Sequence, residues 1–317
     1  MYLIKFAPGF GELVAEQLGK SARIVDVEED MALFESPRPP VVPYASHLYR
    51  VLGSYNARSM AELLRAAALD GRYIAILRGE AQRETFRIQC MDKDQTVRAD
   101  AVQLLALERN VSRAGVAVHR TDAKHELRLW LRGRGKGLFL LKLAQPFTTG
   151  KLPAGVLRAD LCHMLCLLAR VRGEDTCLDP FCGQGAVARA MTHYAGNVTA
   201  SDISVKAVSH AGGVQGVSAR VADMLADTLP AGKYSVIITD PPWGLYRERA
   251  RTDFLDTMCR SIARLMTEDG RCVLFLERSM PVEDCIEAAG LAVTRRFDAL
   301  YSGHKVKALL VQRAEAE

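Results

Sequence analysis

The segment Thr239-Asp240-Pro241-Pro242-Trp243-Gly244 combines an acid, two prolines and a large aromatic ring. It follows the apolar, β-branched run 234–238, so we expect a loop at the carboxyl end of a buried strand. A carboxylate accepts hydrogen bonds from an –NH2 group, prolines leave carbonyl oxygens free, and an indole offers a face for stacking. We therefore predict that Asp240, Pro241, Pro242 and Trp243 are catalytic residues for transfer to an exocyclic nitrogen of a nucleobase.

A second loop, Asp179-Pro180-Phe181-Cys182-Gly183-Gln184-Gly185, joins a strand to a helix through two glycines. Glycines at such a junction allow the backbone to approach a ligand closely. The loop lacks the Lys-Ser/Thr of a phosphate loop and the third glycine of the dinucleotide fingerprint. Asp179 at the strand end suits a cationic amino group better than a pyrophosphate. A tight turn that only packs the helix on the strand remains the structural alternative.

Two further aspartates are predicted to lie at the same edge of the sheet. Asp202 ends the next strand, where doubly wound folds place a carboxylate that binds ribose hydroxyls. Asp223 follows the third strand and is placed to accept from an adenine amine. Either residue alone is equally consistent with a solvated or helix-capping acid. Three acids in register, followed by Asp-Pro-Pro-Trp, indicate a cofactor that has an adenosine and an amino group.

The carboxyl-terminal half alternates strands with helices and short loops, which predicts a doubly wound α/β sheet. The expected strands are 175–180, 197–200, one ending near Asp223, 234–239 and 270–277. The expected helices are 154–170, one ending at Tyr194, 205–211 and 254–266. Residues 291–300 and 306–312 flank a glycine-containing turn and predict an antiparallel hairpin at the end of the sheet.

The amino-terminal half has a different pattern, typical of an α+β fold. The expected strands are 1–6, 22–27, 31–36 and 85–90, the helices are 11–18, 60–68 and 97–109, and 126–132 pairs with 137–143 as a hairpin. Residues 144–153 contain Gln-Pro and Thr-Thr-Gly and are predicted to be a linker.

Charge is distributed unevenly between the two halves. Residues 1–150 carry 22 Lys and Arg against 17 Asp and Glu, whereas residues 151–317 carry 20 of each. The stretch 109–142 alone contains nine basic residues and two acids. A charge run by itself is most often a solvated face, but beside a base-handling motif it favours binding to a phosphate backbone. The candidate RNA-binding residues are Arg120, Lys124, Arg132, Arg134, Lys136 and, after the catalytic segment, Arg247.

Composition points to a globular, multidomain protein. The 317 residues are 49% hydrophobic and 25% charged, without an apolar run of membrane-spanning length. The amino terminus lacks a secretory signal pattern and the eight cysteines are scattered, so we expect a cytoplasmic protein with reduced thiols. Cys162, His163 and Cys166 have no second ligand pair at zinc-site spacing, which favours core packing and no metal. We expect a monomer.

The segments 179–185 and 240–244 resemble motifs I and IV of the Rossmann-like S-adenosylmethionine-dependent amino-methyltransferases, and the terminal hairpin fits their seven-stranded sheet. The amino-terminal half resembles the ferredoxin-like plus THUMP module of tRNA and rRNA guanosine-N2 methyltransferases. That likeness rests on Thr85-Phe86-Arg87-Ile88, the basic stretch 118–124 and the hairpin 126–143. The segment Leu152-Pro153-Ala154-Gly155 departs from the His-Pro-Ala typical before the following helix.

The resemblance implies four parts: a ferredoxin-like domain at 1–58, a THUMP-like RNA-binding domain at 59–143, the linker 144–153 and a methyltransferase domain at 154–317. It implies S-adenosylmethionine as cofactor and N2 of a guanosine in tRNA as target. The residues that it places around the cofactor are Asp179, Pro180, Phe181, Gly183, Gly185, Asp202, Asp223 and Asp240. The alternatives are the same chemistry on rRNA guanosine or on N6 of adenine, and a non-catalytic RNA-binding protein.

Overall fold

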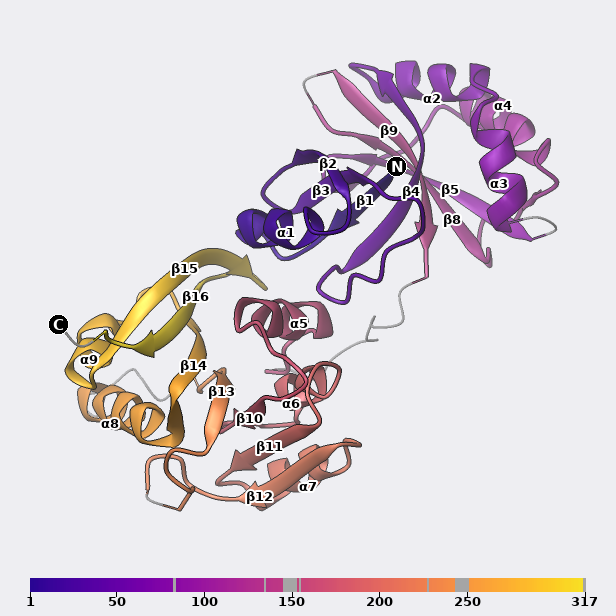
Figure 1. The fold of residues 1–317 in the computed structure, drawn as a ribbon. Helices are drawn as coiled ribbons and strands as arrows, with labels where there is room; N and C mark the ends of the chain where they lie inside the picture. The colour runs from indigo at the N-terminus through magenta and orange to yellow at the C-terminus, as the bar shows by residue number, and fades with distance from the viewer. Residues whose placement is uncertain are drawn as a thin grey trace.

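A computed structural model describes residues 1–81, 84–133, 135–144, 153, 155–226, 228–242 and 251–315 (Figure 1). Over these residues the chain builds two sheets, one from each half, with helices packed on their faces. No helix in the described ranges is both long and apolar enough to cross a membrane.

The carboxyl-terminal half forms, within the described residues, a seven-stranded sheet in the order β12-β11-β10-β13-β14-β16-β15. Neighbouring strands from β12 to β14 are parallel, and β16 runs antiparallel between β14 and β15. The predicted doubly wound α/β sheet with its terminal antiparallel hairpin is therefore confirmed. The strands are β10 (Thr176–Asp179), β11 (Asn197–Asp202), β12 (Val217–Val221), β13 (Tyr234–Thr239), β14 (Met266–Glu277), β15 (Leu291–Tyr301) and β16 (His304–Arg313).

Helices cover both faces of this sheet, which explains why its central strands are apolar throughout. On one face lie α5 (Ala159–Leu168), α6 (Ala186–Met191) and α7 (Val205–Gly212), and on the other α8 (Arg251–Leu265) and α9 (Glu283–Ala288). In β13, Val236 and Ile238 pack toward the first set, and Ile237 packs toward the second. A strand buried on both sides has no solvated face to carry polar residues, so its polar groups collect at its end.

The amino-terminal half forms, over its described residues, one nine-stranded sheet. Its main path is β2-β3-β1-β4-β9-β8-β5-β6, and β7 pairs with β5. The strands are β1 (Tyr2–Lys5), β2 (Arg23–Val27), β3 (Met31–Glu35), β4 (His47–Asn56), β5 (Thr85–Asp92), β6 (Gln95–Thr96), β7 (Ala117–Val118), β8 (His125–Leu131) and β9 (Lys136–Leu143). Antiparallel pairing of β4 with β9 joins residues 1–56 to residues 85–143 in a single sheet.

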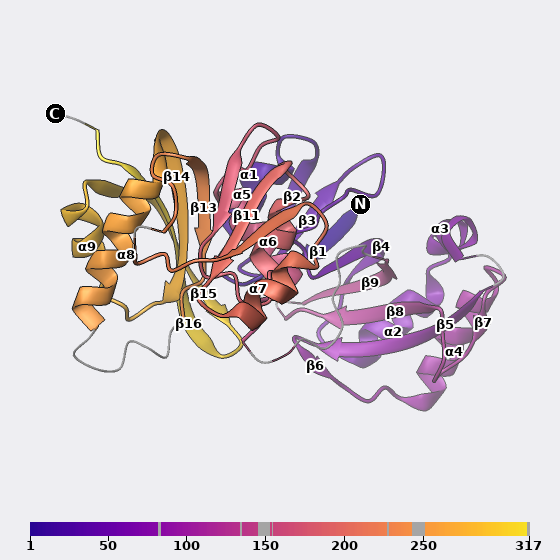
Figure 2. The same cartoon turned by 90° about the horizontal axis from the view of Figure 1, so that it is seen from below.

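Helix α1 (Gly11–Leu18) packs near one end of this sheet, and α2 (Met60–Leu69), α3 (Tyr73–Ala81) and α4 (Ala101–Ser112) cover one face at the other end (Figures 1 and 2). The apolar residues of the second group pack on Leu127, Leu129 and Phe139 of β8 and β9. No element had been predicted at β4 or α3.

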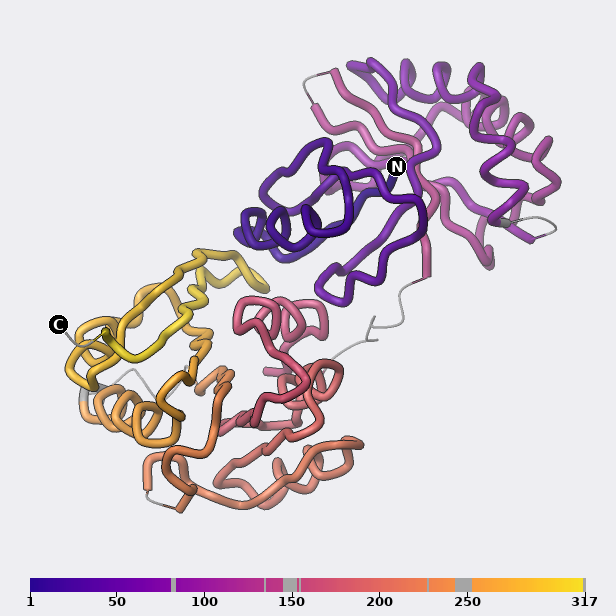
Figure 3. The backbone as a smooth tube through the Cα atoms, in the orientation of Figure 1, coloured from indigo at the N-terminus to yellow at the C-terminus, as the bar shows by residue number. Residues whose placement is uncertain are grey.

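The two halves meet at α5 and the β15–β16 hairpin (Figure 3). Apolar side chains from both halves form one buried cluster there. The rings of Phe10 and Phe297 stack with their centroids 5.5 Å apart. Arg295 donates across the same boundary to Glu16 at 2.7 Å and to Glu12 at 3.0 Å. A Cβ at Gly9 would stand 2.1 Å from the Asp298 carbonyl oxygen, so this contact requires glycine. The amino-terminal half is thereby fixed against β15, at residues 295–298.

Candidate active site

Three aspartates end neighbouring strands or follow them directly at one edge of the seven-stranded sheet. Asp179 ends β10, Asp202 ends β11, and Asp240 follows β13 directly. Strand β10 pairs in parallel with both of the other strands, so the three carboxyl ends point the same way. In open α/β sheets ligands bind outside these ends.

The carboxyl group of Asp179 is almost fully buried, with 1% of its surface exposed. Its pKa is raised to about 8, mainly by burial and also by the nearby charges of Asp240 and Asp202. Backbone amides of Ala188 and Phe181 act in the opposite direction. Its Oδ1 atom has no hydrogen-bond partner among the described residues. A buried acid in this setting is stabilised in its charged form by a cationic ligand.

The loop after β10 uses its two glycines differently. Gly185 has φ +79°, and a Cβ there would meet Ala211 at 3.0 Å, so this glycine allows α6 to pack against α7. Gly183 has φ +48°, and a Cβ there would meet nothing within 4 Å. Open space beside an exposed stretch of backbone is what a bound ligand needs. Gly185 therefore has a packing role, and the open space at Gly183 is compatible with the predicted ligand role.

Asp202 connects this loop to the next strand. Its Oδ2 accepts from the Gly183 N–H at 3.0 Å, and its Oδ1 accepts from the Ser204 N–H at 2.9 Å. The next residue, Ile203, is 72% exposed although it is a large apolar side chain. An exposed isoleucine beside the acid that is predicted to bind ribose could offer an apolar face to a purine ring, a feature that the sequence pattern did not reveal.

The remaining cofactor candidates line the same region. Asp223 follows β12, and its Oδ1 accepts from the Leu225 N–H at 2.9 Å, which holds the loop after this strand in a turn. Phe181 is half-buried and its ring lies 6.1 Å from that of Phe254 on α8. Pro180 is buried directly after Asp179.

The catalytic candidates are described only in part. Asp240 is half-buried, Pro241 is buried and Pro242 is exposed at the end of β13. Trp243 and Arg247 lie outside the described residues, as does Arg134 in the amino-terminal half.

The cysteines near the site are not poised for nucleophilic chemistry. Cys182 is 5% exposed, and burial raises the pKa of its thiol to about 12. Burial also raises the pKa of Cys162 and of Cys166, both on α5. Thiols with raised pKa values stay protonated at neutral pH and react poorly. In the described part of the chain no group of three or more His, Cys, Asp or Glu has the arrangement of a metal site.

The candidate RNA-binding residues do not form one patch. Arg120 and Lys124 precede β8 and pair with Glu108 and Glu84. Arg132 and Lys136 lie beyond the other end of β8, about 20 Å away for a strand of seven residues. The Arg120 and Lys124 side chains are 68% and 71% exposed, but their partners differ, since Glu108 is buried and Glu84 is not. The Lys124–Glu84 pair is an exposed ion pair, weak enough to exchange for a phosphate, whereas Arg120 is held by two hydrogen bonds to a buried acid.

At the second end of β8 the two cations differ. Lys136 is exposed, with Asp26 at 3.5 Å. The Arg132 guanidinium is 12% exposed, pairs with Glu28 and lies 4.7 Å from the Trp130 ring centroid. Arg132 therefore packs as part of the amino-terminal sheet.

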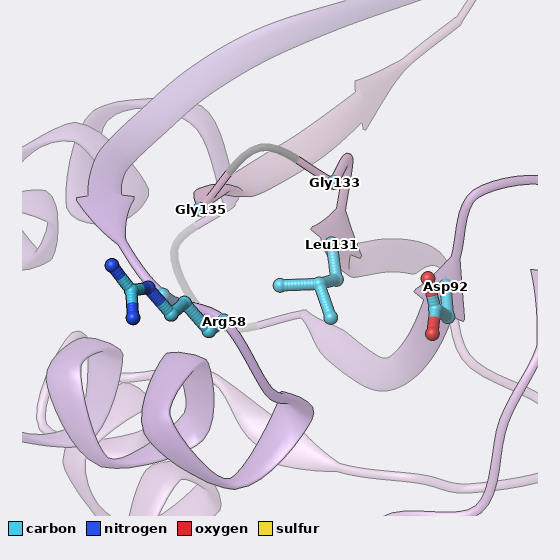
Figure 4. Close-up of a pocket in the computed structure, with 6 residues that line it drawn as sticks. Arg58, Asp92, Leu131, Gly133 and Gly135 are labelled. Carbon is cyan, nitrogen blue, oxygen red and sulfur yellow. The ribbon is translucent and has the colours of Figure 1, made fainter.

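A cavity of about 510 Å³ opens beside the turn between β8 and β9 (Figure 4). It is lined by Ala57, Arg58, Asp92, Leu131, Gly133 and Gly135, with Arg58 and Asp92 on opposite sides of Leu131. The cavity lies in the amino-terminal half and does not include the three aspartates. The cofactor candidates instead line an open edge of the sheet.

A sheet of this order with acids at the ends of β10, β11 and β13 defines a Rossmann-like methyltransferase domain. Residues 151–307 match the model of the UPF0020 family, described as RMKL-like, methyltransferase domain. The cofactor of such a domain is S-adenosylmethionine, as predicted. The buried Asp179 carboxyl fits the amino group of S-adenosylmethionine, and the open space at Gly183 lets the cofactor approach the protein backbone.

Solved structures share the fold over the whole chain. TrmN from Thermus thermophilus has a TM-score of 0.73 and 19% identity, covering 99% of both chains. SMU.472, a putative methyltransferase complexed with SAH, has a TM-score of 0.71 and 12% identity, covering 100% of this chain and 98% of that one. A predicted N6-adenine-specific DNA methylase from Listeria monocytogenes has a TM-score of 0.66 and 11% identity, covering 98% and 95%. No curated protein matches the sequence.

Proposed function

We propose that this protein transfers a methyl group from S-adenosylmethionine to the N2 amine of a guanosine in tRNA. One observation carries the proposal: Asp240-Pro241-Pro242 follows β13, next to the strand that ends in the buried Asp179. The acceptors for an amine and the acid for a cationic cofactor thus lie on adjacent strands. This adjacency would bring the target amine and the methyl group of the cofactor close enough to react in line.

Each residue has a distinct part in this scheme. Asp202 and Gly183 hold the ribose side, and Asp179 balances the amino group of the cofactor. When bound, the cofactor supplies an electrophilic methyl group. The Asp240 carboxylate and the Pro241 carbonyl oxygen accept hydrogen bonds from the two N–H groups of the target amine. The lone pair of the amine nitrogen is then less delocalised into the ring and points at the methyl carbon.

Positive charge develops on the target nitrogen as its bond to the methyl group forms and the methyl–sulfur bond of the donor breaks, which leaves the sulfur as a neutral thioether. The Asp240 carboxylate stabilises this positive charge and accepts the proton directly or through water. Trp243 stacks on the base after it leaves its helix. The buried thiols take no part, because direct transfer needs no covalent intermediate.

The nine-stranded amino-terminal half is proposed to hold the RNA, as a ferredoxin-like domain at 1–58 and a THUMP-like domain at 59–143. Arg120, Lys124 and Lys136 are its proposed phosphate contacts, with Arg134 and Arg247 outside the described residues. The docking of this half through Arg295 and Phe297 supports a fixed distance from the RNA-binding surface to Asp240.

A second candidate is N6 of adenine, because an Asp-Pro-Pro-Trp loop can accept from either amine. The structural similarity to a Listeria monocytogenes protein described as a predicted N6-adenine-specific DNA methylase favours this candidate.

The test is transfer of a tritiated methyl group to total tRNA, rRNA and DNA, followed by nucleoside analysis. The proposal expects N2-methylguanosine from tRNA. Label only in N6-methyladenosine or N6-methyldeoxyadenosine would select the second candidate, and label in neither product would refute both.

A further inference from the structure

Arg158 occupies a fixed position at the same edge of the sheet, next to the first turn of α5. Its guanidinium donates to both oxygens of Asp160, from Nε at 3.1 Å and from Nη2 at 2.9 Å. Its carbon Cζ lies 5.5 Å from the centroid of the Tyr301 ring, and its backbone N–H donates to the Tyr301 hydroxyl at 2.9 Å. The fork and the ring together hold the guanidinium in one orientation.

This guanidinium still has binding capacity. Two of its five N–H groups are used on Asp160. The Arg158 side chain is 47% exposed, whereas the Asp160 side chain is 8% exposed. The buried acid therefore orients the arginine, while about half of the arginine side chain stays in contact with solvent. A planar, pre-oriented guanidinium is suited to a phosphate.

The position of Arg158 relative to Asp240 follows from the register. Thr239 pairs with Leu274, so the next residues, Asp240 and Phe275, lie side by side. The Phe275 ring contacts the Tyr301 ring edge-on, with centroids 6.0 Å apart. Arg158 lies over the Tyr301 ring. Phe275 therefore lies between Asp240 and the Tyr301–Arg158 pair.

The helix gives the same placement independently. Cys162 stands one turn after Arg158 on the same face of α5 and belongs to the apolar cluster that contains Ile238 of β13 and Phe275 of β14. Tyr301 packs against the same cluster. The turn between β15 and β16, which begins after Tyr301, lies at the same edge as the end of β13 (Figure 2).

The order of the strands places the cofactor candidates and Arg158 on opposite sides of Asp240 at the carboxyl edge of the sheet. Asp202 and Asp179 lie on one side of Asp240, and Phe275, Tyr301 and Arg158 lie on the other. We propose that Arg158, held by Asp160 and Tyr301, binds a phosphodiester of the nucleic acid next to the target nucleotide. This inference rests on the proposed function. Arg158 is a positioning residue that sets how the target base enters the site.

The experiment measures RNA affinity against salt concentration for the full-length protein. Each lost phosphate contact lowers the slope of log K against log salt by about 0.7 to 0.9. We expect Arg158→Gln to lower the slope by this amount and to weaken tRNA binding about tenfold. Affinity for S-adenosylmethionine should stay unchanged. Arg260→Gln, which removes an exposed arginine on α8, is the matched control and should leave the slope unchanged.

Two further variants guard against a folding defect. The double variant Arg158→Gln/Asp160→Asn replaces both partners, so no buried carboxylate loses its cation, and it should show the same reduced slope. Arg158→Lys keeps the charge and should keep most of the slope.

The outcomes are separable. If the wild-type protein binds RNA and the slope is unchanged in both Arg158→Gln and Arg158→Gln/Asp160→Asn, this inference alone is overturned. Loss of S-adenosylmethionine affinity without a change in slope would assign Arg158 to the cofactor carboxylate and also overturn it. A wild-type protein that binds no RNA and methylates none overturns the proposed function and this inference together.

Discussion

The Asp202 carboxylate accepts a hydrogen bond from the Gly183 N–H at 3.0 Å and thereby ties the end of β11 to the loop after β10. Its second oxygen accepts from the Ser204 N–H at 2.9 Å. One acid thus shapes the cofactor loop and closes the turn before α7. It also has lone pairs left for ribose hydroxyls, because a carboxylate offers about four acceptor positions.

Asp202→Asn should weaken both the fold and cofactor binding. An amide has one acceptor oxygen, so the Gly183 or the Ser204 N–H loses its partner and faces an NH2 group. Hydrogen bonds to a charged group contribute about 1.5–3 kcal/mol, so we expect unfolding free energy to fall by roughly that amount. Affinity for S-adenosylmethionine should fall at least about tenfold. Denaturant titration and calorimetry measure the two effects.

The control for this change is Asp269→Asn, which alters an exposed acid in β14 far from the carboxyl edge. It should change neither quantity. Equal behaviour of the two variants would contradict the assigned role of Asp202.

The two glycines of the cofactor loop should respond differently to alanine. Both have positive φ, so either substitution costs about 1–2 kcal/mol in backbone strain. Gly185→Ala also drives a Cβ to 3.0 Å from Ala211 and should cost about 1–3 kcal/mol more. Gly183→Ala should be the more stable protein but the weaker binder of S-adenosylmethionine. The reverse order in thermal unfolding would contradict the separate roles.

Binding of S-adenosylmethionine should release a proton at pH 7. Burial raises the pKa of Asp179 to about 8, so the carboxyl is mostly protonated before the cation arrives. Affinity should therefore rise with pH up to about 8 and then level off. Calorimetry in two buffers of different ionisation enthalpy counts the proton, and Asp179→Asn should abolish the release. Binding with no proton change in the wild type would contradict an ionised Asp179 facing the cofactor.

The same group affects stability of the protein without cofactor. Its pKa rises from 3.8 in the unfolded chain to about 8 in the folded one, so between these values the folded state binds more protons. This contribution to stability is full below pH 3.8 and is lost as the pH rises through 8. Asp179→Asn should flatten that part of the stability profile, as denaturant unfolding at several pH values will test.

The seven-stranded sheet was predictable because its strands are short apolar runs that end in acids. The run 234–238 shows both its burial and its boundary directly in the sequence. Strand β4 was not predictable in the same way, because His47, Arg50 and Gly53 interrupt its pattern and its partner β9 begins only at Lys136. Pairing at such sequence distance leaves no local signal. The helix α3, which contains Gly79, was likewise not predicted.

Within the site, residue types were predictable and their contacts were not. The acids were found from their place after strands, but the bond from Gly183 to Asp202 and the exposure of Ile203 depend on how two loops meet. The basic stretch 109–142 appeared as one feature because its members are close in sequence. Strand β8 separates Lys124 from Arg132, since an extended strand carries its two ends apart.

The central claim is that Asp240 acts on the target amine and not on the fold or on cofactor affinity. Asp240→Ala removes the carboxylate that accepts a hydrogen bond from one N–H of the target amine, and with it the negative charge that stabilises the methylated nitrogen. The measurement is single-turnover methyl transfer to tRNA at saturating S-adenosylmethionine, with cofactor affinity determined in parallel. We predict a fall in the transfer rate of at least about a hundredfold, with cofactor affinity changed less than about threefold. A transfer rate near that of the wild type would contradict the account.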